Sequence, residues 1–265
     1  MMKNGEKKGF IPVLVLITYL IMVVMNALAN LVPLNGITTG EVSDSYPNLF
    51  APAGITFAIW GLIYILLGLY TLYQWGFFQG SRERRTDRLL GKVGVLFALT
   101  SLTNALWIIA WHYRWIPISL GLMLFLLVLL IAINLILVKA VLTGREAVFI
   151  RLPFQVYFGW ITVATIANVT VFLVDYGLPR TSVSESLWTI VVILVGALIG
   201  ILTMLRIRSK AYGIVLIWAY MGIQIKHTSP TGFDQGYPSV IMATLISIVL
   251  FTLTEVYLFF SKKKD

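Results

Sequence analysis

The stretch Asn48–Tyr70, NLFAPAGITFAIWGLIYILLGLY, decides the fold of this chain. It opens with a proline-containing turn and then continues without a charged side chain. The apolar run extends over residues 53–77. At about 1.5 Å per helical residue, such a run is long enough to cross the ~30 Å hydrocarbon core of a bilayer. The stretch therefore predicts a transmembrane helix.

The rest of the chain repeats this pattern. Seven more apolar runs lie at 10–32, 90–113, 117–139, 152–174, 185–206, 210–226 and 237–261, of which 210–226 is short. The chain is 59% hydrophobic and 12% charged, which is far more apolar than a soluble domain. The runs show no alternation of polar and apolar residues, which favours helices over barrel strands. We expect an all-α, polytopic transmembrane bundle of about eight spans, forming a single membrane domain over residues 1–265.

The basic residues indicate the orientation of this bundle. All but three of the 20 lysines and arginines fall in segments that eight spans would place on one side; the exceptions are Arg114, Arg180 and Lys226. The positive-inside rule then predicts a multi-pass protein of the cell membrane with both termini cytoplasmic. This topology explains the net charge of +9, so the charge does not indicate a nucleic-acid partner. The first run exceeds the 7–15 residues of a signal-peptide core, and we expect it to be a retained helix rather than a cleaved signal.

The sequence offers little material for catalysis or metal binding. It has no cysteine and only two histidines, His112 and His227. The spans carry almost no ionisable side chain; Glu255 is the exception and lies near the basic end of the last run. Intramembrane charges usually mark ion coupling, so a proton-driven pump is disfavoured. We predict no catalytic residue, no metal site and no permanently bound cofactor.

The spans contain uncharged amides and tryptophans instead. The amides are Asn26, Asn30, Asn104, Asn134, Gln155 and Asn168. Four tryptophans lie deep in the predicted spans, at 60, 107, 160 and 218, and four lie near span ends, at 75, 111, 115 and 188. Amides in lipid need partners, so they should face the bundle interior, where they bond either to another helix or to a ligand. A deep indole suits stacking on a planar ligand and also suits plain packing.

Three motifs occur in order along the chain. They are APAGITFAIWGLIY at 51–64, NALWIIAW at 104–111 and WITVATIAN at 160–168. Together they resemble the motifs of the TspO/MBR family, the tryptophan-rich sensory proteins related to the mitochondrial translocator protein. The resemblance covers about residues 10–175, which correspond to five helices. The helices predicted within 182–265 are additional to that pattern.

The resemblance implies a function and a site. It implies a sensor or receptor that binds a porphyrin, a haem-type molecule or another flat hydrophobic ligand in a pocket between the second, third and fifth helices. The residues that match the family's motifs are the expected ligand-binding residues: Pro52, Trp60, Tyr64, Asn104, Trp107, Trp160, Thr162 and Asn168. Members of the family are often dimeric, so a homodimer is possible. The glycines of GALIG, 196–200, could serve such a dimer or packing within the chain.

Two other classes of function stay open. An uncoupled transporter or permease of a small hydrophobic solute could use the same pocket, although the chain shows no internal repeat of the kind found in many transporters. An enzyme acting on a porphyrin or an isoprenoid is less favoured, because the spans carry no nucleophile with a base and no paired carboxylates. The sequence leaves the identity of the ligand open.

Overall fold

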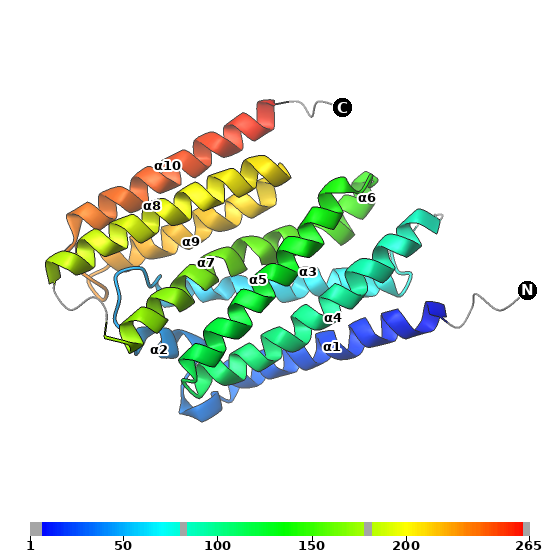
Figure 1. Ribbon diagram of the computed structural model, residues 1–265, viewed down its shortest axis with the longest axis horizontal. Helices are drawn as coiled ribbons and strands as arrows, with labels where there is room; N and C mark the ends of the chain where they lie inside the picture. The colour runs from blue at the N-terminus through cyan, green and yellow to red at the C-terminus, as the bar shows by residue number, and fades with distance from the viewer. Residues whose placement is uncertain (1–6, 80–83, 178–181, 262–265) are drawn as a thin grey trace, which may run out of the picture. The chain divides into compact units, whose positions relative to one another are not determined.

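The computed structural model describes residues 7–79, 84–177 and 182–261 (Figure 1). These ranges contain helices and no strand, which confirms the predicted all-α class. The long helices are α1 (Lys7–Leu31), α3 (Ile59–Gln74), α4 (Arg84–His112), α5 (Ile116–Lys139), α7 (Leu152–Asp175), α8 (Ser182–Ile207), α9 (Lys210–Thr228) and α10 (Pro238–Phe260). The short elements are η1 (Leu34–Gly36), α2 (Thr39–Asp44), η2 (Gly54–Ala58), α6 (Gly144–Glu146) and the π-helical turn η3 (Ala147–Arg151).

Each of the eight predicted runs forms a helix. Within the described residues, seven helices are long and apolar enough to cross a membrane, which makes this a multi-pass membrane protein. The helix outside that set is α9, formed by the short run at 210–226, which begins at Lys210 and carries Lys226 and His227 in its last turn. These polar ends lower its apolar content. The orientation of the termini in the membrane stays a prediction.

The helices pack into two compact units. Unit 1 comprises Met1–Thr38 and Trp60–Phe154, and unit 2 comprises Thr39–Ile59 and Gln155–Asp265. The chain therefore enters unit 2 with the loop after α1, returns to unit 1 with α3, and changes unit again within α7. Each unit is described below by itself.

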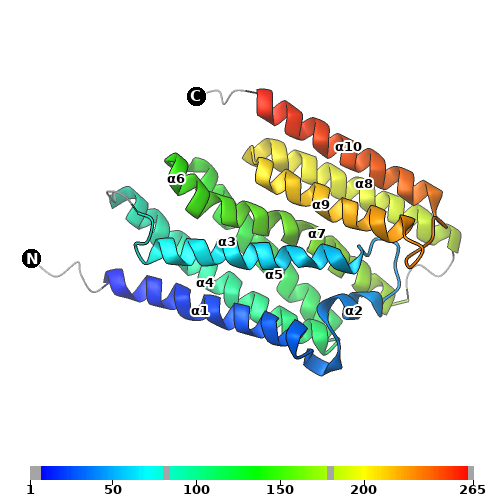
Figure 2. The ribbon, with the colours of Figure 1, turned by 180° about the vertical axis from the view of Figure 1, so that it is seen from behind.

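In unit 1, α4 lies between α1 and α5 and packs along both (Figures 1 and 2). The helix α3 is held to α1 by the partly buried Tyr19 and to α4 by the buried Gln74. The Tyr19 hydroxyl of α1 donates a hydrogen bond to Tyr64 O (3.0 Å), and Gln74 Nε2 donates to Leu90 O of α4 (3.0 Å). Since a buried polar group without a partner is costly, these bonds fix how α3 meets its neighbours.

Three of the four asparagines in the spans of unit 1 link helices, which is one of the two roles that the sequence left open. The expectation that Asn30 faces the interior was wrong, because Asn30 is exposed and its Nδ2 donates to Asn26 O of its own helix. Asn26 Nδ2 of α1 donates to Asn104 Oδ1 of α4 (2.7 Å), and Asn134 Nδ2 of α5 donates to Phe154 O (3.2 Å). All three asparagines are buried. Helix-to-helix hydrogen bonds of this kind contribute roughly 0.5–2 kcal/mol each.

In unit 2, α10 packs along both α8 and α9 (Figures 1 and 2). The GALIG glycines of α8 allow this packing. A Cβ at Gly196 would lie 2.7 Å from the Tyr220 hydroxyl of α9, and one at Gly200 would lie 2.9 Å from the Phe251 ring of α10. Of the two uses predicted for this motif, the structure displays packing within the chain.

The same unit contains the loop that follows α1, residues 39–59, and α9 holds this loop along one face. Trp218 Nε1 donates to Thr56 O (3.0 Å), and one turn later Gly222 O accepts from Ala53 N (2.9 Å). Gly222 has no room for a side chain, because a Cβ there would collide with the Thr56 hydroxyl.

One further turn along α9, two side chains continue the attachment. The Lys226 ammonium pairs with the Asp44 carboxylate at 2.9 Å, and His227 Nε2 donates to Leu49 O at 2.8 Å. Positions 218, 222 and 226 are spaced by four, so they share one face of a helix. The loop thus rests on α9 over three helical turns.

Candidate ligand-binding site

The eight predicted site residues divide equally between the two units. Unit 1 contains Trp60, Tyr64, Asn104 and Trp107, and unit 2 contains Pro52, Trp160, Thr162 and Asn168. All except Tyr64 are buried. The two groups are described separately, because each has its own geometry.

In unit 1, four aromatic side chains form a continuous series, here called the aromatic row: Trp60 and Tyr64 of α3, and Trp107 and Trp111 of α4. Trp60 stacks on Tyr64, with 5.6 Å between ring centroids and 17° between planes. Trp60 lies 6.0 Å from Trp107, which in turn stacks on Trp111 at 5.8 Å and 23°. Each helix contributes residues four apart, so each pair shares a helical face. Near-parallel rings at these distances attract one another.

Two N–H donors accompany the aromatic row. Asn104 Oδ1 accepts the bond from Asn26, but Asn104 Nδ2 has no hydrogen-bond partner among the residues that the structure describes. The same holds for Trp107 Nε1. Asn104 is 0% exposed and Trp107 is 4% exposed, so both donors lie away from bulk solvent.

These two donors are three residues apart on α4, and therefore lie on one face of the helix. A buried donor without a partner costs about 1–3 kcal/mol, which a hydrogen-bond acceptor on a bound molecule would offset. The site carries no charge of its own. Chemically, it offers indole and phenol rings for stacking and two N–H groups for a carboxylate or carbonyl oxygen.

In unit 2, the predicted residues have contacts of a more structural kind. Trp160 packs edge-to-face against Phe57, with 5.9 Å between centroids and 81° between planes. The Thr162 hydroxyl donates to Phe158 O (2.9 Å) and accepts from the Tyr212 hydroxyl (3.1 Å), which links α7 to α9.

The other two lie in different parts of unit 2. Pro52 is buried in the loop that rests on α9, directly before Ala53, whose N–H donates to Gly222 O. Asn168 is buried in α7. The ligand-binding role of all four residues of this group stays a prediction.

The sequence missed one member of the aromatic row. Trp111 was grouped with the tryptophans near span ends, where interfacial belts are expected, yet it is only 4% exposed and stacks on Trp107. Its spacing of four from Trp107 was the available signal, because residues four apart in a helix lie above one another.

The described part of the chain contains no cluster of metal ligands. No group of three or more His, Asp or Glu side chains lies close enough together there to hold an ion. The features that remain for ligand recognition in unit 1 are stacking surface and N–H donors.

Comparison with known proteins identifies the family. A family model described as "TSPO-like protein" matches residues 12–257 of this chain. The match extends past residue 175, where the sequence motifs end, and includes α8, α9 and most of α10. No curated protein and no solved structure matches the chain.

Proposed function

The chain belongs to the TSPO-like protein family, and on that premise we propose that it is a membrane receptor for a flat, hydrophobic, conjugated molecule such as a porphyrin. The ligand binds against the aromatic row of unit 1. Its ring system stacks on the indoles, and its acidic or carbonyl oxygens accept from Asn104 Nδ2 and Trp107 Nε1.

The observation that carries this proposal is the pair of unpaired donors beside the stacked rings. Packing alone accounts for stacked tryptophans, but it does not account for two buried N–H groups without an acceptor. Natural proteins satisfy most buried donors, and exceptions call for an explanation such as a ligand or an ordered water. A porphyrin supplies both a wide aromatic face and carboxylate acceptors.

A ligand at the aromatic row would change how helices pack, because the rings and the donors belong to two different helices. Trp60 and Tyr64 belong to α3, and Asn104 and Trp107 belong to α4. A ligand that touches both helices favours the arrangement in which both sets of contacts are made. It shifts the population of helix arrangements by as much as its affinity differs between them.

The test is a titration of intrinsic tryptophan fluorescence with protoporphyrin IX, using the full chain purified in detergent. Trp107→Phe keeps an aromatic ring but removes the N–H donor, and Trp115→Phe is the matched control, since Trp115 is exposed and stacks on Tyr113 outside the aromatic row. We expect saturable quenching in the wild type and in the control. In Trp107→Phe the dissociation constant should rise about tenfold to a hundredfold, because a hydrogen bond to a charged group is worth about 1.5–3 kcal/mol.

A second porphyrin separates the two parts of the mechanism. Etioporphyrin has the same flat ring but no carboxylates, so its affinity should be the same in Trp107→Phe and in the control. Equal protoporphyrin affinity in all three proteins would contradict recognition by the donors. Absence of saturable quenching in the wild type would contradict the receptor proposal, and uptake into proteoliposomes would then test the transporter alternative.

A further inference from the structure

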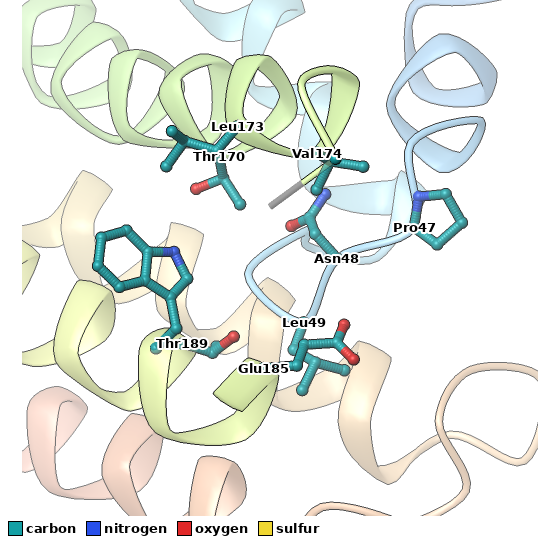
Figure 3. Close-up of a pocket in the computed structure, with 10 residues that line it drawn as sticks. Pro47, Asn48, Leu49, Thr170, Leu173, Val174, Glu185 and Thr189 are labelled. Carbon is teal, nitrogen blue, oxygen red and sulfur yellow. The ribbon is translucent and has the colours of Figure 1, made fainter. Parts of the chain in front are cut away.

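A cavity lies entirely within unit 2, and none of the residues of the aromatic row lines it (Figure 3). Its volume is about 320 Å³. Three segments form the walls: the loop residues 47–49, the last turns of α7, and the first turns of α8. The lining residues are Pro47, Asn48, Leu49, Thr170, Leu173, Val174, Gly177, Glu185, Trp188 and Thr189.

The electrostatics of this cavity favour a positive charge. The Glu185 carboxylate lines it, is half-buried, and forms no ion pair or hydrogen bond with any residue in the described ranges. The end of α7 at Asp175 contributes Leu173 and Val174. The carboxyl end of α7 and the amino end of α8 both border the cavity and carry partial charges of opposite sign, so the Glu185 carboxylate decides the sign of the site.

One polar side chain in the wall offers an acceptor. The Thr170 hydroxyl donates to Ile166 O (2.9 Å), so that its oxygen remains as an acceptor. Asn48 is engaged within its own loop, where Nδ2 donates to Tyr46 O (2.8 Å) and Oδ1 accepts from Phe50 N (3.1 Å). These bonds hold the Asn48 amide within the loop wall.

The indole of Trp188 completes the chemistry. It lines the same cavity and is 42% exposed, so the protein leaves part of the ring uncovered. A cation over an indole face gains about 0.5–1 kcal/mol at an exposed site, and recognition of quaternary ammonium groups commonly combines aromatic faces with acidic side chains.

We propose that this cavity binds a small organic ammonium ion, with the Glu185 carboxylate as counter-ion and the Trp188 indole as the stacking face. A volume of about 320 Å³ lies at the small end of the range of ~300–1,000 Å³ typical of ligand sites. An anion is disfavoured because Glu185 would repel it. The ammonium group belongs either to a free solute or to the headgroup of a lipid, and both have the same chemistry.

The experiment uses the full chain in dodecyl maltoside, a detergent without an ammonium group, and radiolabelled choline in equilibrium dialysis. The neutral isostere 3,3-dimethylbutan-1-ol has the shape of choline without its charge, and it should compete poorly. Glu185→Gln should weaken choline binding about threefold to fivefold, and Trp188→Leu about twofold to fivefold. Asp234→Asn is the matched control, because Asp234 is an exposed carboxylate of unit 2 that does not line the cavity.

Competition then identifies the source of the ammonium group. Displacement of choline by short-chain phosphatidylcholine but not by glycerophosphocholine would assign the site to a lipid headgroup held by its acyl chains. Equal displacement by both would assign it to a free solute, and either result supports the ammonium site. The proposal is overturned if choline does not bind, if the neutral isostere competes as well as choline, or if Glu185→Gln and Asp234→Asn bind choline equally. None of these results bears on porphyrin binding at the aromatic row.

Discussion

In unit 1, Asn104 Nδ2 and Trp107 Nε1 have no acceptor among the described residues, whereas in unit 2 the comparable donors of Trp218 and Tyr212 are both engaged. Trp218 Nε1 donates to Thr56 O, and the Tyr212 hydroxyl donates to Thr162 Oγ1. The two units thus use the same kinds of side chain in different ways.

Whether a donor is engaged distinguishes residues that hold the fold together, here called the framework, from residues that are available to bind a ligand. An engaged donor stabilises one arrangement of the chain, as Trp218 does by attaching the loop 39–59 to α9. A buried donor without an acceptor costs free energy in the empty protein and returns it when a ligand supplies the acceptor. We therefore assign the engaged donors of Trp218 and Tyr212 to the framework, and Asn104 Nδ2 and Trp107 Nε1 to ligand recognition. Four predictions test that assignment.

The largest effect is expected where the loop meets α9 most closely. Gly222→Ala places a Cβ against the Thr56 side chain, so that either the loop or α9 must move. Overpacking of this kind costs about 1–3 kcal/mol. Thermal unfolding of the detergent-solubilised protein should show the loss. The control is Gly61→Ala in α3, where a Cβ would meet nothing within 4 Å and no loss is expected. Equal stability of the two variants would contradict attachment of the loop through Gly222.

Substitutions of Asn26 and Asn104, the amide pair of unit 1, should have strongly non-additive effects on stability. Asn26→Leu removes the donor to Asn104 Oδ1 and leaves a buried oxygen unpaired, which should cost about 1–2 kcal/mol. Replacing both residues by leucine removes the donor and the acceptor together, so the double variant should be more stable than the sum of the single losses predicts. Additive losses in this cycle, measured by chemical denaturation in detergent, would show that the two amides do not depend on one another.

Two matched Trp→Phe substitutions compare the units directly. Trp218→Phe loses the bond to Thr56 O and should cost about 0.5–1.5 kcal/mol beyond the change in ring size. Trp107→Phe removes a donor that has no partner among the described residues, so only the change in ring size should affect the stability of the ligand-free protein. Melting temperatures of both variants without added ligand measure the difference. An equal loss in both would mean that Trp107 Nε1 already has an acceptor.

Much of the fold could be predicted from the sequence because a membrane leaves the backbone few choices. Each apolar run must form its hydrogen bonds internally, so each run became a helix, although α3 begins six residues later and α4 six residues earlier than its run. Pro117 and Pro238 lie in the first turns of α5 and α10, where a missing N–H is harmless. The need of buried amides for partners predicted that Asn26 and Asn104 face the interior, but not that they pair with one another.

Features of the fold that depend on contacts between residues far apart in the sequence could not be predicted. The loop 39–59 rests on α9 through residues more than 160 positions away, and no periodicity in the loop indicates its partner. The cavity of unit 2 likewise combines Asn48 and Glu185, which only the folded chain brings together. For the site, the motifs identified Trp60 and Trp107 but could not show that their partners would include Trp111, or that the eight residues would divide between two units.

The smallest expected effect on stability is a pH dependence due to His227. This residue lies in the last turn of α9, a helix outside the seven candidate spans, and bonds to the loop 39–59 at Leu49. Burial lowers the pKa of His227 below its ordinary value, although the hydrogen bond with Leu49 O opposes the shift. Nε2 carries the proton donated to Leu49 O, so a second proton must go to Nδ1, which is buried with no partner in the described part of the chain.

Because the folded-state pKa lies below the unfolded one, the unfolded chain binds more protons as the pH falls through about 6.5. The stabilisation by neutral His227 is fully present above that pH and is lost progressively below it. The melting temperature should therefore fall between pH 8 and pH 5. In His227→Gln, whose amide N–H can still donate to Leu49 O but does not titrate, the fall should be smaller. If the melting temperatures of the two proteins fall equally with pH, the pH dependence comes from other groups, such as His112. The attachment of the loop at Leu49 would then not depend on the protonation of His227.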